Sequence, residues 1–102
     1  MPYFAMNRFR VIRGHEETFL NHWKNRDSHL DAVPGFVHFQ LLQGKQTEEH
    51  TLFISHTEWE SEQSFIDWTQ SEAFRKAHAN AGKGTREIYA GPPQLELFNA
   101  VL

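Results

Sequence analysis

The 102-residue chain contains no cysteine, which excludes disulfides, zinc thiolates, iron–sulfur clusters and thiol nucleophiles. It has no apolar run near the ~18 residues that a membrane-spanning helix needs. Its opening residues, MPYFAMNRFRV, lack the continuous apolar core of a signal peptide. We therefore expect one domain over residues 1–102, located in the cytoplasm and not associated with a membrane.

A concentration of basic charge is also missing. The ten Lys and Arg residues are scattered among 13 Asp and Glu, and the formal net charge is −3. A nucleic-acid-binding face would gather its basic residues into a stripe or patch, so we expect no nucleic-acid partner. GxGxxG, P-loop, HExxH and GxSxG motifs are absent too. With no flavin or nicotinamide motif, the electrons for any redox reaction would come from outside the chain.

Aromatic side chains, in contrast, are plentiful. The chain has nine Phe and three Trp, and aromatic residues make up 14% of it. Such a content indicates a well-filled core, an exposed apolar interface, or a pocket for a flat ligand.

Hydrophobic periodicity and turn signals predict the order β-α-β-β-α-β, an α+β ferredoxin-like split βαβ fold. The predicted strands are Tyr3–Ile12, Phe36–Gln43, His50–Trp59 and Gln94–Leu102. The predicted helices are His15–Leu30 and a kinked pair. In the pair, the first helix has Ser61 as its N-cap and ends at Trp68, and the second has Ser71 as its N-cap and ends at Ala79. A turn is predicted at Val33–Phe36, and a hairpin loop at Gly44–Glu49.

Several strands carry apolar residues on both faces. In the first strand, Phe4 and Met6 point away from the row that contains Tyr3, and Phe98 and Leu102 do the same in the last strand. A sheet that is apolar on both faces needs a second cover. We expect that cover to be a second copy of the chain, which would give a symmetric homodimer with two sheets packed as an α+β barrel.

Asn7 is the first candidate site residue, because it falls in the apolar row of the first strand. A buried amide costs about 1–3 kcal/mol unless its donors and acceptors are satisfied. It therefore either bonds to the backbone or addresses a ligand. In the second case its NH₂ group would stabilise negative charge on a bound oxygen species.

Trp68 and His78 are the other two candidates. Trp68, in FIDWTQ, is either a core aromatic or the wall of a ligand pocket. His78, in SEAFRKAHANAG, ends a helix face of small and aromatic residues and precedes a Gly-rich loop. It is either a structural histidine or the single axial ligand of a haem, which leaves the distal side free for oxygen.

These residues lie in segments that resemble a known family. MNRFRVIRG, VPGFVHFQLLQG, SHTEWES and DWTQSEAFRKAH resemble the IsdG- and HmuQ-type haem-degrading monooxygenases of the antibiotic biosynthesis monooxygenase (ABM) superfamily. The resemblance covers nearly the whole chain as one ABM domain. That branch is marked by an Asn–Trp–His set, and Asn7, Trp68 and His78 occupy its three positions.

The resemblance implies a function and a role for each of the three residues. The chain would bind haem and cleave the porphyrin with O₂ and an external electron donor, releasing iron and a bilin-type product, and an unidentified reductase would be its partner. His78 would be the proximal ligand of the metal, Asn7 would hydrogen-bond the distal ligand, and Trp68 would push the porphyrin out of plane.

Two other functions are compatible with these residues. In a cofactor-independent ABM-type monooxygenase, Asn7 and Trp68 would bind an aromatic or quinol substrate, and His78 would be a base or a bystander. In a non-catalytic haem-binding protein, the same three residues would hold haem without turnover. A His78-dependent Soret band separates the first alternative from haem degradation, and decay of that band with a reductant separates the second.

Overall fold

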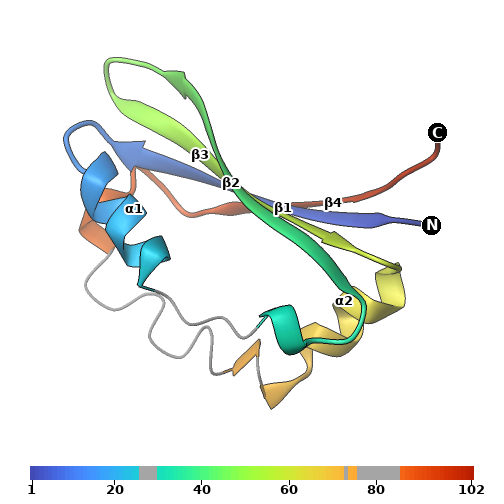
Figure 1. The fold of residues 1–102 in the computed structure, drawn as a ribbon. Coiled ribbons are helices and arrows are strands. Elements are labelled where there is room, and N and C mark those ends of the chain that lie inside the picture. Colours follow the sequence, from blue (N-terminus) through green and yellow to red (C-terminus); the bar gives the residue numbers. More distant parts are fainter. Residues whose placement is uncertain (26–29, 73, 76–85) are drawn as a thin grey trace.

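The computed structural model of the chain describes residues 1–25, 30–72, 74–75 and 86–102. The elements are β1 (Tyr3–Ile12), α1 (Glu16–Lys24), η1 (Leu30–Ala32), β2 (Phe36–Gln46), β3 (His50–Trp59), α2 (Glu62–Thr69), η2 (Arg86–Ile88) and β4 (Gln94–Asn99). In the described ranges the strands form one antiparallel sheet in the order β2-β3-β1-β4. Figure 1 shows α1 and α2 on the same face of this sheet. The predicted ferredoxin-like α+β fold is confirmed.

The first predicted helix, His15–Leu30, is wrong at its C-terminal end. The helix α1 ends at Lys24, and Leu30 begins a short 3₁₀ turn. Asn25 caps α1, with its backbone N–H donating to the Asn21 carbonyl. Asn side chains compete for local backbone hydrogen bonds, which favours them at helix ends over helix interiors.

Two strand limits also differ from prediction. β2 continues through a register shift to Gln46, so the hairpin loop begins at Thr47 and not at Gly44. The Thr47 hydroxyl accepts the N–H groups of Glu49 and His50, which closes this short loop. β4 ends at Asn99 and not at Leu102, because Asn99 pairs with Tyr3, the first residue of β1, and the pairing continues past it with the Ala100 N–H, which donates to the Pro2 carbonyl near the start of the chain.

The helix-covered face of the sheet carries two separate apolar clusters. The first cluster consists of Tyr3, Ala5, Leu30, Trp59 and Phe65. The second cluster consists of Phe9, Val11, Phe19, Phe53 and Ile88. β1 and β3 contribute to both, so the two central strands run beneath the whole core. Trp23 and Phe39, each packed against a different cluster, stack with ring centroids 5.7 Å apart.

The start of α2 is fixed against the start of β2. Gly35 has φ of +83°, and a side chain there would collide with Ser64. Glycine is therefore required both by the backbone conformation and by the close approach of α2. Ser61 caps α2 as predicted, its hydroxyl accepting the N–H of Ser64. These contacts place the rest of α2, including Trp68, over the first cluster.

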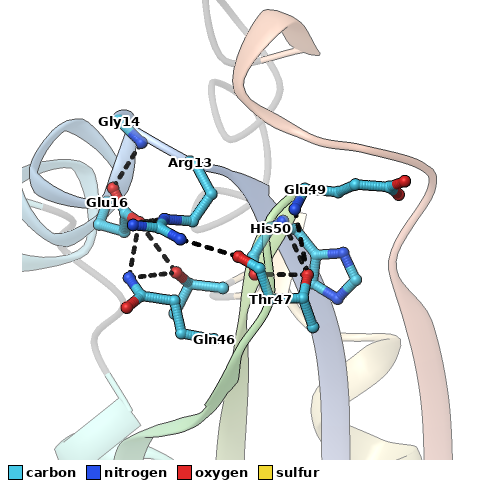
Figure 2. A network of polar contacts seen from close by, with 8 residues as sticks. Arg13, Gly14, Glu16, Gln46, Thr47, Glu49 and His50 are labelled. Carbon is cyan, nitrogen blue, oxygen red and sulfur yellow. Dashed lines mark hydrogen bonds and ion pairs between the residues drawn. The ribbon is translucent and has the colours of Figure 1, made fainter.

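A hydrogen-bond network fixes the start of α1 to the sheet (Figure 2). The fully buried Thr51 of β3 donates to Glu16 Oε2 at 2.8 Å, and Gln46 Nε2 donates to Thr51 at 3.1 Å. The backbone N–H of Gly14 donates to the other Glu16 oxygen, and Arg13 Nε lies 3.5 Å from Oε2. Hydrogen bonds from its own backbone N–H and from Thr51 hold the pKa of the Glu16 carboxyl below its usual value.

The other face of the sheet is not covered by α1 or α2 (Figure 1). Its apolar residues include Phe4, Met6, Ile54 and Phe98, and Phe98 remains 45% exposed. We call this surface the open face. In the described residues, no helix is long and apolar enough to cross a membrane.

Candidate functional site

Asn7 lies on β1 between the two apolar clusters. Its same-face neighbours along the strand are Ala5 of the first cluster and Phe9 of the second. Across the sheet it pairs with Ser55 of β3 and Leu95 of β4. An amide therefore stands between residues of the two clusters, on the side that the helices cover.

The side-chain carbonyl of Asn7 has no hydrogen-bond partner. Its Oδ1 is buried, and no donor within the described residues reaches it. Thr57, on the same face, differs: its hydroxyl donates to the Ala5 carbonyl and accepts the Trp59 indole N–H, both at 3.2 Å. Buried polar groups are normally paired, and an unpaired one requires a reason such as a ligand.

Trp68 packs against the first cluster. It is half-buried, with its ring centroid 5.2 Å from that of Trp59 and 4.8 Å from that of Phe74, which it meets edge-on. Its carbonyl accepts a hydrogen bond from the Ser71 hydroxyl at 2.6 Å, and that hydroxyl accepts the N–H of Phe74. Ser71 is thus a cap, as predicted, and the chain turns immediately after Trp68.

Two of the three predicted site residues lie on the same side of the sheet. Asn7 borders Ala5 of the first cluster, and Trp68 packs against that cluster. His78 lies outside the described residues, so its role as ligand stays a prediction. No group of three or more His, Cys, Asp or Glu suited to a metal ion occurs among the residues that the structure describes. A haem iron needs only one axial protein ligand, because the porphyrin supplies the others.

The arrangement suits a flat, largely apolar ligand with a polar centre. Aromatic rings of the first cluster and α2 lie on the same face of the sheet as Asn7, whose Oδ1 has no partner among the described residues. Such a combination of apolar walls with few polar groups is typical of small-molecule sites. The residues present therefore fit a porphyrin. The sequence did not identify Ser55 as a neighbour of Asn7, because that position follows from the register between β1 and β3.

A shallow hollow of about 180 Å³ occurs on the open face, away from Asn7. It is lined by Arg8, Arg10, His50, Leu52 and Gln94. Arg8 also lies 3.6 Å from a Glu96 carboxylate oxygen. Solvent-exposed charges surround this hollow, and none of the predicted site residues contributes to it.

Comparison with known proteins places these features in a family. The sequence model of the antibiotic biosynthesis monooxygenase family matches residues 2–80. A "Heme oxygenase (staphylobilin-producing)" from Staphylococcus haemolyticus is 28% identical over 85 residues, covering 83% of this chain and 81% of that protein. A "Heme-degrading monooxygenase" from Bacillus thuringiensis is 25% identical over 76 residues, covering 74% and 70%.

Solved structures agree with the fold and include a porphyrin complex and a cofactor-independent oxygenase. A variant of MhuD with two manganese protoporphyrin IX molecules bound per active site is 27% identical, with a TM-score of 0.71 over 98% of this chain and 95% of that one. A variant of SnoaB, a cofactor-independent oxygenase from Streptomyces nogalater, is 18% identical, with a TM-score of 0.70 over 99% and 94%. At that identity, the similarity to SnoaB concerns the fold alone.

Proposed function

Because this chain belongs to the antibiotic biosynthesis monooxygenase family, we propose that it is the haem-degrading kind of monooxygenase. It would take haem as its substrate and cleave the porphyrin with O₂ and electrons from an external donor, releasing iron and a bilin-type product. The names of two relatives and the porphyrin complex of MhuD support this substrate. The observation that carries the proposal is the buried, unpaired side-chain carbonyl of Asn7, which lies beside Ala5 of the aromatic first cluster.

Asn7 would act on the distal side of the bound haem. Its amide NH₂ would donate a hydrogen bond to the ligand there, where negative charge develops. Its Oδ1 is buried, and hydrogen bonds to charge are stronger inside a protein than in water. The amide would also favour one position of the ligand over the others, which would influence where the ring is cut.

Trp68 would form the wall against the porphyrin face. Its contacts with Trp59, Phe65 and Phe74 leave the indole little freedom to withdraw. A wall held in this way can press a bound macrocycle out of its plane, and such distortion is one of the means by which a protein tunes haem. The change Trp68→Phe would shorten the wall, and resonance Raman spectra of the haem complex would then show a flatter porphyrin. An unchanged spectrum would contradict this role.

The open face supports a homodimer as the working form. Apolar side chains such as Met6, Ile54 and Phe98 lie there without a covering layer from α1 or α2. Burying them against a second copy would remove an apolar surface from water. Sedimentation equilibrium of the purified protein should give twice the chain mass of 12.0 kDa. A monomer mass at micromolar concentration would contradict the dimer.

Titration with hemin tests the proposed substrate and its ligand together. The parent protein should develop a sharp Soret band that saturates, and His78→Ala should lose it. His15→Ala is the matched control, because His15 is exposed and makes no capping hydrogen bond through its side chain. A His78→Ala variant that binds hemin as the parent does would refute the ligand role. A parent without a Soret band would refute haem binding and favour a cofactor-independent oxygenase.

A further inference from the structure

We propose that Ser55 is a positioning residue, whose hydroxyl orients the Asn7 amide toward the bound ligand. This inference rests on the proposed haem function. It concerns a residue of β3 to which neither the family match nor the predicted Asn–Trp–His set assigns a role.

The register of the sheet places Ser55 directly beside Asn7. The two residues are Cα partners in the antiparallel β1–β3 ladder, and both side chains point to the helix-covered face. Directly opposed residues have Cβ atoms about 4.5–5.5 Å apart. The same row continues to Leu41 of β2 on one side and to Leu95 of β4 on the other. An amide and a hydroxyl therefore stand together between two leucines.

Two threonines on this face have partners, whereas this pair does not. Thr51 bonds to Glu16 and Gln46, and Thr57 bonds to backbone and indole groups. Ser55 is half-buried, and its hydroxyl makes no hydrogen bond with the described residues. The Asn7 carbonyl is buried and also lacks one. The Ser55 hydroxyl and the Asn7 carbonyl, both without a hydrogen bond to the described residues, are cross-strand neighbours between residues of the two clusters.

The chemistry of the amide makes its orientation decisive. An Asn side chain presents two N–H donors on one side and a carbonyl acceptor on the other, and a half turn exchanges them. Only the N–H side stabilises an anionic ligand. A serine hydroxyl rotates freely and can donate to the carbonyl. When Ser55 donates to Asn7 Oδ1, the NH₂ group is directed to the ligand. Without that donor, both orientations are populated.

Azide binding to the ferric haem complex measures this effect without turnover, because azide is an anionic ligand that accepts a hydrogen bond. We expect Ser55→Ala to raise the azide Kd about 3- to 10-fold, the factor that one hydrogen bond contributes. Ser55→Thr keeps the hydroxyl and should restore the parent value. Ser55→Val has the same shape as Ser55→Thr without the hydroxyl and should behave like Ser55→Ala.

A double-mutant cycle tests whether Ser55 acts through Asn7. In an Asn7→Ala background, Ser55→Ala should change the azide Kd no further. Additive effects of the two changes would overturn the positioning role, and so would an unchanged Kd in both Ser55→Ala and Ser55→Val. Thr57→Val is the control: it should lower thermal stability, since it removes the partner of the Trp59 indole, and leave the azide Kd unaltered.

The outcome also separates this inference from the function on which it rests. A parent protein that forms no Soret band with hemin refutes both. A parent that forms the band, with azide affinity insensitive to the Ser55 hydroxyl, refutes the positioning role and leaves haem binding intact.

Discussion

Two groups of polar side chains on the helix-covered face differ in their hydrogen bonding. The Glu16–Thr51 network at the start of α1 is fully connected, and Thr51 is 0% exposed. The Asn7–Ser55 pair, farther along the same two strands, has a buried carbonyl with no partner among the described residues. Buried polar groups that stabilise a fold are paired within the protein, whereas groups that serve a ligand can remain unpaired until it binds. We therefore assign the first region to the stability of the fold, and the proposed function assigns the second to ligand binding.

The largest effect that this comparison predicts is the loss of activity in Asn7→Ala. Removing one hydrogen-bond donor to developing charge typically lowers kcat by about 10²–10³-fold. The variant should still bind hemin, and its free energy of unfolding should not fall, because the change deletes an unsatisfied carbonyl. Single-turnover rates with hemin, measured beside urea unfolding of the apoprotein, check both parts. A stability loss that matches the loss of activity would make Asn7 a structural residue.

Thr51→Val should have the opposite signature. Valine keeps the shape of threonine but removes the hydrogen bonds of the buried Thr51 hydroxyl to Glu16 and Gln46, and one such hydrogen bond contributes about 0.5–1.5 kcal/mol. The unfolding midpoint in urea should fall, while the rate of haem degradation at 25 °C stays close to that of the parent. Unchanged stability would show that the network contributes nothing, and a selective loss of activity would reverse the assignment of the two regions.

The smallest expected effect is a pH dependence that originates in the network. The pKa of Glu16 lies below the ordinary value of 4.5, so the ionised carboxylate stabilises the folded state above that pH. This stabilisation is lost as the pH falls through the lowered pKa. Parent and Glu16→Gln should therefore differ in melting temperature at pH 7, and the difference should shrink as the pH falls below 4.5 through the lowered pKa. A difference that stays constant as the pH falls would assign the effect to shape and not to charge.

The limits of the two central strands, β1 and β3, were predicted correctly, whereas the neighbour of Asn7 across them was not. Alternation alone defines β1 and β3, and it places Asn7 in the apolar row. The caps Ser61 and Ser71 follow from local chemistry. The partnership of Asn7 with Ser55 depends on the register between strands distant in sequence, which no local pattern encodes.

The limits of the less regular elements depend on neighbours that alternation does not reveal. The helix α1 ends with the Asn25 N–H donating to the Asn21 carbonyl, and the end of β4 depends on where β1 begins. The division of the core into two clusters arises from where α1 and α2 pack on the sheet. The position of Asn7 between these clusters therefore depends on tertiary packing and not on the local sequence.

The most direct test of haem degradation is an absorbance time course of the parent protein with one equivalent of hemin, followed by ascorbate with catalase and an iron chelator. The proposed function predicts that the Soret band decays, that a bilin-type spectrum replaces it, and that iron appears in the chelator in the amount of the haem lost. A Soret band that persists, with no iron captured, would contradict the proposed function and indicate a protein that binds haem without cleaving it.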